Sequence, residues 1–311
     1  MIKLRDRISN KLKDIAKPPT SATMNAKDKV IFEMKADLLT EKTLNSSSVG
    51  IASDDICRGQ EVIVSLTTYG KRLYDAYLPI ESIMQGSIKP NRIILWLAEE
   101  LRNQELPLTL KRQQDRGLEV RFCEDIKSYK KLIPTLKEFP DACIVTIDDD
   151  AIYKFDLIER MTSAYNDDPN FIYANRMRRI TIGDDGKPVS YMQWPYCSND
   201  DGASHLNFSI GVGGVLYPPG ALAKEVFNES VFMDLCCTAD DVWLNAMALL
   251  NGTKVKKVIT RHPLGFDYVS NYNVQDIALM NANANKYTGA CLNNKILADV
   301  YSKYDLYEKL I

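Results

Sequence analysis

The sequence predicts an α/β protein with a mostly parallel sheet flanked by helices. Two observations predict it. Short apolar runs rich in β-branched residues recur along the chain, and segments with the apolar spacing of helices lie between them. This alternation is typical of βαβ units, whose parallel strands are buried on both faces. The chain has 311 residues, of which 45% are hydrophobic and 26% charged, and this suits one large globular domain or two small ones.

The elements follow in order from residue 61. The runs EVIVSL, RIILWL, LEVRF and ACIVTI predict strands, at residues 61–66, 92–97, 118–122 and 142–147. Helical patterns separate and follow these strands, within residues 72–85, 106–116, 128–139 and about 156–166. The second half is less regular, with strands expected at 171–176, 214–218 and 253–259 and a helix at 240–252.

Residues 1–57 differ from the rest of the chain, because they are rich in Lys, Ser, Thr and Asn and poor in aromatic residues. Segments 17–23 and 44–50 are typical of linkers. We therefore expect an N-terminal helical and linker segment at 1–57, a single α/β domain at 58–270, and a helical extension at 271–311.

The N-terminal segment also carries a basic amphipathic pattern. One helix face could hold five apolar side chains, those of Ile2, Leu4, Ile8, Leu12 and Ile15. Such a helix, with lysines and arginines around it, can lie on an anionic membrane surface; a solvated helix or a frayed tail is the alternative. No apolar signal-peptide core and no membrane-length apolar run occurs. We expect a cytoplasmic protein, with peripheral contact at the inner face of the membrane as one role for this segment.

Charge and cysteine usage exclude two classes. A net charge of -2 and a pI of about 5.9 leave no basic field for a long nucleic acid, so we expect no nucleic-acid partner. The seven cysteines are odd in number and show no CxxC spacing. This pattern indicates reduced thiols rather than a disulfide framework or a zinc site.

Three adjacent carboxylates, Asp148, Asp149 and Asp150, directly follow the apolar run 142–147. Ligands of open α/β sheets bind at the carboxyl ends of the strands. Because side chains alternate along an extended segment, we expect Asp148 and Asp150 on one side and Asp149 on the other. Two carboxylates aimed at one point repel unless a cation lies between them, and a hard divalent ion suits that place. The alternative is a solvated turn in which Asp149 or Asp150 caps the next helix.

Three further motifs follow this cluster in order. SIGVGGVLYPP carries Gly213 and Gly214, which allow either a close backbone approach to a ligand or a tight turn. TADDVW places Asp240 and Asp241 at the start of a predicted helix, where one can cap the helix while the other faces a pocket. ITRHPLGF places His262 after a predicted strand, as a ligand or as a structural histidine.

Together these motifs resemble the nucleotide-sugar glycosyltransferases with the GT-A fold, a Rossmann-like α/β fold. The resemblance covers roughly residues 61–268. The phrases SYKKLIP, TIDDD, GVGGVLYPP and ADDVW look like those of bacterial glycosyltransferases that build surface polysaccharides. The resemblance implies a hexosyltransferase-like enzyme of polysaccharide or lipopolysaccharide synthesis. It would move a sugar from a nucleotide-diphosphate sugar, with a UDP-sugar as first choice, to a glycan or lipid-linked glycan.

The resemblance also implies a set of nucleotide-sugar contacts. They are Thr67, Thr68, Tyr69, Arg72, Lys130, Lys131, Asp148, Asp149, Gly213 and Gly214. The segment Thr67–Tyr69 would meet the base and ribose, Arg72 would reach the diphosphate or the base, and one of the two lysines would counter the phosphates. Without the resemblance, the first segment is an ordinary βα loop and the lysines are a solvated basic helix face.

A divalent cation and a catalytic base follow from the same resemblance. Asp150 is the first choice of metal ligand, Asp148 would bind the ribose or the metal, and His262 would be a further ligand. Oxygen ligands with one imidazole suit Mn²⁺ or Mg²⁺, which would neutralise charge on the departing diphosphate. Asp241, or Asp240, would accept the proton of the acceptor hydroxyl, and a base of this kind implies inversion at the anomeric centre.

Other readings of the Asp cluster remain open. A Mg²⁺-dependent phosphohydrolase of the haloacid dehalogenase type would use Asp148 as nucleophile and Asp150 as acid, but its motif normally follows the first strand, and three strand-like runs precede it here. A nucleotidyltransferase needs a Gly-rich basic loop after the first strand, and TTYGKR is a poor match. A sugar-binding or scaffold protein on the same fold is a third alternative, and the presence of all four motifs argues against it.

Overall fold

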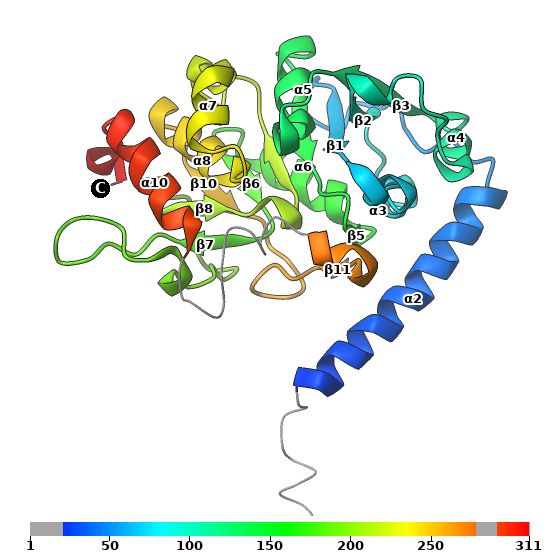
Figure 1. Ribbon diagram of the computed structural model, residues 1–311, viewed down its shortest axis with the longest axis horizontal. Coiled ribbons are helices and arrows are strands. Elements are labelled where there is room, and N and C mark those ends of the chain that lie inside the picture. The colour runs from blue at the N-terminus through cyan, green and yellow to red at the C-terminus, as the bar shows by residue number, and fades with distance from the viewer. Residues whose placement is uncertain (1–20, 278–290, 311) are drawn as a thin grey trace, which may run out of the picture.

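The computed structural model describes residues 21–277 and 291–310 (Figure 1). Its strands are β1 (Val62–Thr67), β2 (Arg92–Ala98), β3 (Leu118–Cys123), β4 (Cys143–Thr146), β5 (Ala151–Tyr153), β6 (Ile172–Ala174), β7 (Met177–Arg179), β8 (Asn207–Ser209), β9 (Val215–Tyr217), β10 (Val255–Lys257) and β11 (Tyr268–Ser270). Its α-helices are α2 (Ser21–Asn45), α3 (Tyr77–Met84), α4 (Leu108–Gln114), α5 (Ile133–Glu138), α6 (Leu157–Asp167), α7 (Glu229–Leu235), α8 (Asp240–Asn251) and α10 (Leu292–Lys303).

Within the described residues, seven strands form the central sheet in the order β10-β6-β9-β4-β1-β2-β3. Strands β4, β1, β2 and β3 pair in parallel, as do β6 and β10, and β9 alone runs against its neighbours β4 and β6. The predicted α/β class with a mostly parallel sheet is confirmed. Two small antiparallel pairs, β11-β5 and β7-β8, lie beside this sheet.

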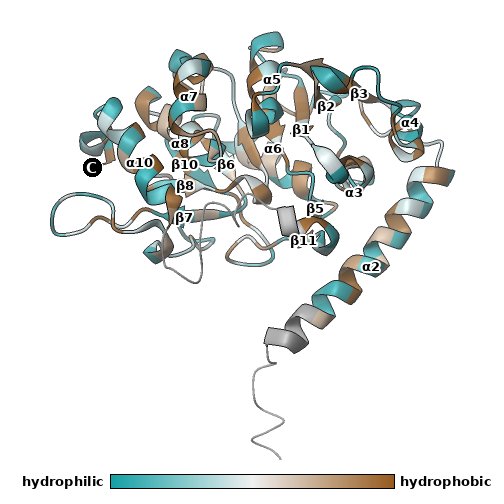
Figure 2. Ribbon diagram, in the orientation of Figure 1, coloured by the Kyte–Doolittle hydropathy of each residue, from teal (hydrophilic) through white to brown (hydrophobic). Residues whose placement is uncertain are grey.

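Helices cover both faces of the sheet, as the apolar strands require. Along β1, Val62 and Val64 pack into the cluster that receives α3, α4 and α6, whereas Ile63 packs into the cluster that receives α5, α7, α8 and α10. Burying an aliphatic side chain of this kind stabilises a fold by about 1.5–3 kcal/mol. Figure 2 shows the apolar residues gathered along the strands and the helix faces turned toward them.

The reversed strand β9 decides where the functional residues meet. In the β4–β9 pairing, Thr146 at the end of β4 lies opposite Val215 at the start of β9. The Asp cluster leaves β4 at this edge, and the glycine segment 211–214 enters β9 at the same edge. The sequence places these two motifs more than 60 residues apart, and the antiparallel strand brings them together.

Helix α2 extends beyond the body of the domain at its N-terminal end (Figure 1). Phe32 and Leu39 are buried against Leu78 of α3 and Ile152 of β5. The helix starts at Ser21, so it includes the last residues of the linker predicted at 17–23. The basic helix predicted within residues 2–17 lies outside the described residues. Among the helices that the structure describes, none combines the length and apolar character that a bilayer crossing needs.

Candidate active site

Lys131 is the centre of an ionic cluster at the edge where β4 ends. Its Nζ lies 2.8 Å from Oδ1 of Asp148 and 2.8 Å from Oδ2 of Asp240. Burial opposes the charge of Lys131, but the three carboxylates of Asp148, Asp240 and Asp241 outweigh it and raise the lysine pKa well above its ordinary value. Lys131 is therefore cationic at neutral pH, and it joins the Asp cluster to the start of α8.

Asp241 occupies a backbone cradle built by the glycine segment. The N–H of Gly211 donates to both carboxylate oxygens of Asp241, at 3.1 and 3.2 Å. A Cβ on Gly211 would lie 2.9 Å from Oδ1 of Asp241 and 2.9 Å from Nζ of Lys131, so only glycine leaves room for both groups. Burial, and then the charge of Asp240, raise the pKa of Asp241 to about 7, although Lys131 lowers it. A carboxyl with this pKa can exchange a proton at neutral pH.

Asp240 has a different environment from its neighbour. It accepts a hydrogen bond from Oγ of Ser128 at 2.9 Å in addition to its ion pair with Lys131. Neither it nor Asp241 caps α8 with its side chain, since the cap position is Ala239 and no side-chain cap hydrogen bond forms. The capping alternative for the Asp pair is thus wrong in this structure, and Asp241 is the better placed of the two to act as a base.

Arg72 holds the other two residues of the Asp cluster. Its Nη1 lies 2.7 Å from Oδ1 of Asp149, and its Nη2 lies 3.2 Å from Oδ2 of Asp150. Burial raises the pKa of Asp149 to about 6 against the opposing charge of Arg72. Arg72 was predicted to contact the diphosphate or the base; here its guanidinium is occupied by these two carboxylates.

The expected alternation within the Asp cluster is therefore wrong. Strand β4 ends at Thr146, and residues 149–150 form a turn, so the pleat of a strand does not set their directions. Asp149 and Asp150 share one guanidinium, while Asp148 turns to Lys131. The Asp148 backbone N–H also donates to Oη of Tyr153 at 2.9 Å.

Tyr153 links the Asp cluster to the glycine segment. Its hydroxyl accepts from the Asp148 N–H and donates to the carbonyl oxygen of Val212 at 3.1 Å. The sequence motifs gave neither Tyr153 nor Ser128 a role. The aromatic residues that follow Asp150 were the available signal for Tyr153, whereas nothing in the local sequence distinguishes Ser128 from other serines.

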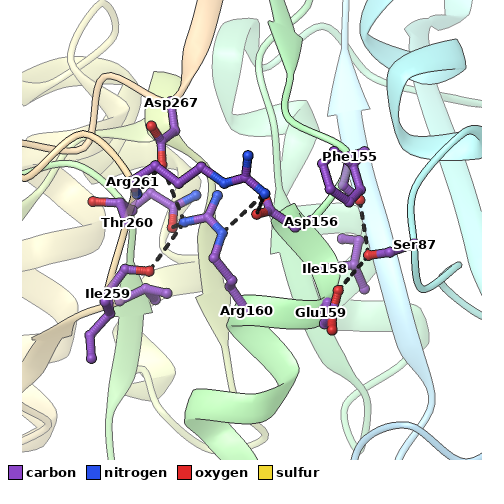
Figure 3. A network of polar contacts seen from close by, with 12 residues as sticks. Ser87, Phe155, Asp156, Ile158, Glu159, Arg160, Ile259, Thr260, Arg261 and Asp267 are labelled. Carbon is purple, nitrogen blue, oxygen red and sulfur yellow. Dashed lines mark hydrogen bonds and ion pairs between the residues drawn. The ribbon is translucent and has the colours of Figure 1, made fainter.

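The loop that carries His262 is fixed to α6 through Arg261 and Asp267 (Figure 3). The Asp267 carboxylate accepts from the N–H groups of Arg261, at 2.8 Å, and His262, at 3.0 Å. Arg160 of α6 lies 3.5 Å from Asp267 and 3.2 Å from Asp156, and Arg261 reaches Asp156 at 3.2 Å. Two arginines and two aspartates thereby join the loop after β10 to the first turn of α6.

The His262 ring does not join the Asp cluster in this structure. Its Nδ1 accepts the N–H of Leu264 at 3.2 Å, and its ring meets Phe266 edge-on at 5.2 Å. Metal binding through Nε2 would require the ring proton at Nδ1, and that hydrogen bond would be lost. Among the residues that the structure describes, no three His, Cys, Asp or Glu side chains are grouped as a metal site.

The charge balance of the cluster nevertheless fits a divalent cation. Among the described residues, the carboxyl groups of Asp148, Asp149, Asp150, Asp240 and Asp241 outnumber the two cations that they meet, Arg72 and Lys131. Oδ2 of Asp149 is buried with no hydrogen-bond donor from that part of the chain. Buried excess charge is unfavourable unless a further cation joins it, and a set of carboxylate oxygens suits Mg²⁺ or Mn²⁺.

Other predicted contacts are engaged elsewhere. The Thr67 hydroxyl donates to the carbonyl oxygen of Trp96 at 2.8 Å, and Lys130 is ion-paired with Asp125, so only the second lysine reaches the Asp cluster. Thr68 is buried and Tyr69 is exposed, 5.5 Å from the Arg72 guanidinium.

Gly213 and Gly214 occupy positions where a residue with a Cβ would be strained or would clash. Gly214 has a φ of 87°, and a Cβ on Gly213 would lie 2.6 Å from Cβ of Arg176. The segment is thus both a turn and a close backbone approach, the two readings that the sequence left open.

No protein-family model and no curated protein matches the chain. Among solved structures, the chain is similar to residues 1–349 of S. aureus TarS in complex with UDP, at 14% identity and a TM-score of 0.46, over 78% of this chain and 71% of that one. S. aureus TarS matches at 12% identity and 0.45, over 72% and 39%. The inositol-1-phosphate CTP transferase from T. maritima matches at 16% identity and 0.39, over 64% and 85%. Likenesses of this size identify no activity, so the residues of the site must indicate one.

Proposed function

We propose that the protein is a glycosyltransferase that uses a nucleotide-diphosphate sugar, with Asp241 as its base. The observation that carries the proposal is the Asp241 carboxyl, which has a pKa of about 7 and is held by the Gly211 N–H. It lies beside Lys131, which also binds Asp148 at the end of β4. A base poised near neutral pH, next to carboxylates at the carboxyl end of a parallel sheet, is what glycosyl transfer to a hydroxyl requires.

The proposed transfer needs one proton acceptor from the protein, Asp241. The acceptor oxygen forms a bond to the anomeric carbon, the bond from that carbon to the diphosphate oxygen breaks, and Asp241 takes the hydroxyl proton. Attack from the side opposite the leaving group inverts the anomeric centre. Gly211 and Lys131 hold Asp241 in place, and such positioning is worth orders of magnitude in rate because small misplacements of a catalytic group are costly.

Asp148 and Asp150 are the residues that would hold a divalent cation, Mn²⁺ or Mg²⁺. Bound there, the cation would neutralise charge on the departing diphosphate. Arg72 restrains Asp149 and Asp150 in a position facing the same edge. His262 is proposed as a further ligand only after a change of its loop, because its Nδ1 is engaged by Leu264.

Donor, acceptor and location follow the family resemblance. A UDP-sugar is the first donor to test, and a glycan or lipid-linked glycan of bacterial polysaccharide or lipopolysaccharide synthesis is the acceptor class. The reaction would take place in the cytoplasm, with peripheral membrane contact through the basic segment within residues 2–17.

The test is release of nucleoside diphosphate from a panel of nucleotide sugars, with and without Mn²⁺. We expect metal-dependent release with at least one donor, loss of it in Asp241→Asn, and retention in Asp234→Asn, a matched change at an exposed position of α7. Nucleotide binding should survive Asp241→Asn and lose its Mn²⁺ dependence in Asp150→Ala.

Three results would contradict the proposal. Rapid hydrolysis of a chromogenic phosphate ester without sugar transfer favours the phosphohydrolase reading. Release of pyrophosphate from a nucleoside triphosphate favours a nucleotidyltransferase. Tight binding of a nucleotide sugar without turnover favours a binding protein.

A further inference from the structure

Two arginines beside the glycine segment have no acidic partner among the residues that the structure describes. Arg176 precedes β7 and Arg178 lies within it, and both guanidinium groups donate to one neutral oxygen, Oη of Tyr196, at 2.8 and 3.1 Å. Within residues 21–277 and 291–310, neither arginine forms an ion pair with a carboxylate. Arg179, the next residue in the strand, is paired with Asp201 at 3.1 Å. Two like charges that converge on a hydroxyl repel each other unless an anion joins them.

The remaining contacts of the pair are also uncharged. Arg178 donates to the carbonyl oxygens of Tyr191 and Trp194, at 3.1 and 2.9 Å. Arg176 donates to the Tyr268 hydroxyl. The Nε atoms of both arginines are buried without a hydrogen-bond partner. Guanidinium N–H groups that are buried without an acceptor destabilise the fold. An oxyanion that binds the guanidinium bidentately satisfies such donors.

Aromatic rings enclose the two guanidinium groups. The Arg176 guanidinium lies 4.3 Å from the ring centroid of Phe266 and 5.0 Å from that of Tyr196, and the Arg178 guanidinium lies 4.5 Å from Tyr196 and 5.0 Å from Tyr191. The loop that Figure 3 shows fixed to α6 carries Phe266 to this place. Burial alone would raise the pKa of Tyr196, but the charges of both arginines outweigh it and lower the pKa. The two arginines therefore stabilise the anionic form of the Tyr196 phenol.

This arginine pair packs against the glycine segment, whose Gly211 holds the candidate base. The Ile210 N–H donates to the Arg176 carbonyl at 3.0 Å, and Gly213 packs directly on Arg176. Burial, and next the charge of Asp241, raise the pKa of Tyr191, the residue whose ring lies beside the Arg178 guanidinium. The acceptor must approach on the side of the base, whereas the donor is expected at the Asp cluster.

We propose that Arg176, Arg178 and Tyr196 bind an oxyanion of the acceptor, a phosphate or carboxylate group carried by the glycan. The identification of the ligand as the acceptor rests on the proposed glycosyl transfer. The anion site itself rests on the two arginines alone. The planar fork of arginine matches both anions bidentately, and the rings around it offer apolar faces to a sugar. The enzyme would thereby select anionic glycans over neutral ones.

The probe is glucose 6-phosphate, with glucose as the neutral reference, measured by equilibrium titration at low salt with the full chain. We expect binding of the phosphate compound only, weakened by about tenfold or more in Arg176→Gln/Arg178→Gln, since each charge-assisted hydrogen bond contributes that order of affinity. Arg179→Gln is the matched control and should bind as the wild type does. Arg178→Lys serves if the double variant does not fold, because it keeps the positive charge and removes only the planar guanidinium. We expect it to weaken binding less than the double variant does.

Titration in saturating UDP distinguishes a site for an acceptor phosphate from a site for the phosphates of the donor. If UDP leaves glucose 6-phosphate binding unchanged, the arginine pair belongs to the acceptor. If UDP displaces the probe, or if the arginine variants bind it as the wild type does, the proposal is overturned. Because binding is measured without turnover, failure of the donor panel leaves this result intact and removes only the proposed glycosyl transfer.

Discussion

Two buried ionic clusters in this protein differ in their charge balance. Glu81 on α3 and Arg116 after α4 form a pair whose side chains are 0% and 2% exposed. Both Nη groups of Arg116 meet the Glu81 carboxylate, at 2.8 to 3.0 Å, and Thr43, Gln85 and Gln113 donate to its oxygens. One negative charge is matched by one positive charge. The candidate active site instead gathers five carboxylates around Lys131 and Arg72.

This difference in charge balance is the one expected between a structural cluster and a functional one. The balanced pair joins α2, α3 and α4 and leaves no charge for a ligand to satisfy. In the unbalanced cluster, burial and then neighbouring carboxylates raise the pKa values of Asp149 and Asp241, and one oxygen of Asp149 has no donor among the described residues. Perturbed groups of this kind gather at functional sites, where a ligand or metal offsets the unfavourable charge.

The largest effect is expected in the balanced pair. Glu81→Ala leaves the Arg116 guanidinium buried and unpaired, and breaking such a pair costs about 3–5 kcal/mol. Glu61→Ala removes one of the two acidic partners of Arg92, from a pair that is 35% to 37% exposed, and should cost about 1 kcal/mol or less. Urea denaturation measures both. Equal losses would show that burial does not distinguish the two pairs.

A smaller effect, confined to turnover, is expected at the glycine segment. Gly211→Ala places a Cβ 2.9 Å from Oδ1 of Asp241 and from Nζ of Lys131, and displacement of a catalytic group by such a clash lowers the rate by about 100-fold. The thermal midpoint should change little. Gly202→Ala is the control, because a Cβ there meets nothing within 4 Å. Full activity of Gly211→Ala would separate Asp241 from the chemistry.

The smallest expected effect is a shift in pH dependence. A base must be deprotonated, so the rate should rise with pH through about 7, the pKa of Asp241. Lys131 lowers that pKa, so Lys131→Gln should move the midpoint upward. Lys130→Gln, which removes a partner of Asp125 outside the Asp cluster, should leave it in place. A profile without a midpoint near neutrality, or one that Lys131→Gln leaves unmoved, would assign the base elsewhere.

The regular part of the fold was predictable, because its strands and helices are long enough to show a period. Strands β1 to β4 and helices α3 to α6 and α8 fall within the ranges expected, apart from one residue at the ends of β1, β2, β3 and α6. The three-residue strands β5, β7, β8 and β11 were missed, whereas the equally short β6, β9 and β10 lie within the ranges expected. Helix α2 was expected only as part of the helical and linker segment 1–57. Its bounds were not predicted, because apolar residues such as Met34 and Leu38 are exposed on it while Phe32 is buried.

The motifs of the site were predictable, but their partners were not. The sequence could not choose between Lys130 and Lys131, because a turn of 3-10 helix decides which one faces the Asp cluster. Arg72 lies 77 residues before Asp149, so only the folded sheet reveals their ion pair. Arginines are ordinary in edge strands, and only the absence of an acidic partner among the described residues makes Arg176 noticeable.

The most direct test of the difference between the two clusters is Asp241→Asn, followed by thermal unfolding and turnover at pH 8. The raised pKa means that the folded protein binds this proton more tightly than the unfolded chain does. The destabilisation by Asp241 therefore grows as pH rises from the ordinary carboxyl pKa of 3.8 through about 7, and it is fully present at pH 8. The asparagine removes that charge.

The expected result is a protein that unfolds roughly 2 °C or more above the wild type and that has lost about 10²- to 10⁴-fold in turnover. A smaller rise at pH 5, where only part of the destabilisation between pH 3.8 and about 7 is present, completes the prediction. A variant that unfolds earlier than the wild type at pH 8 and still transfers sugar would contradict the account, because Asp241 would then be a structural residue like Glu81.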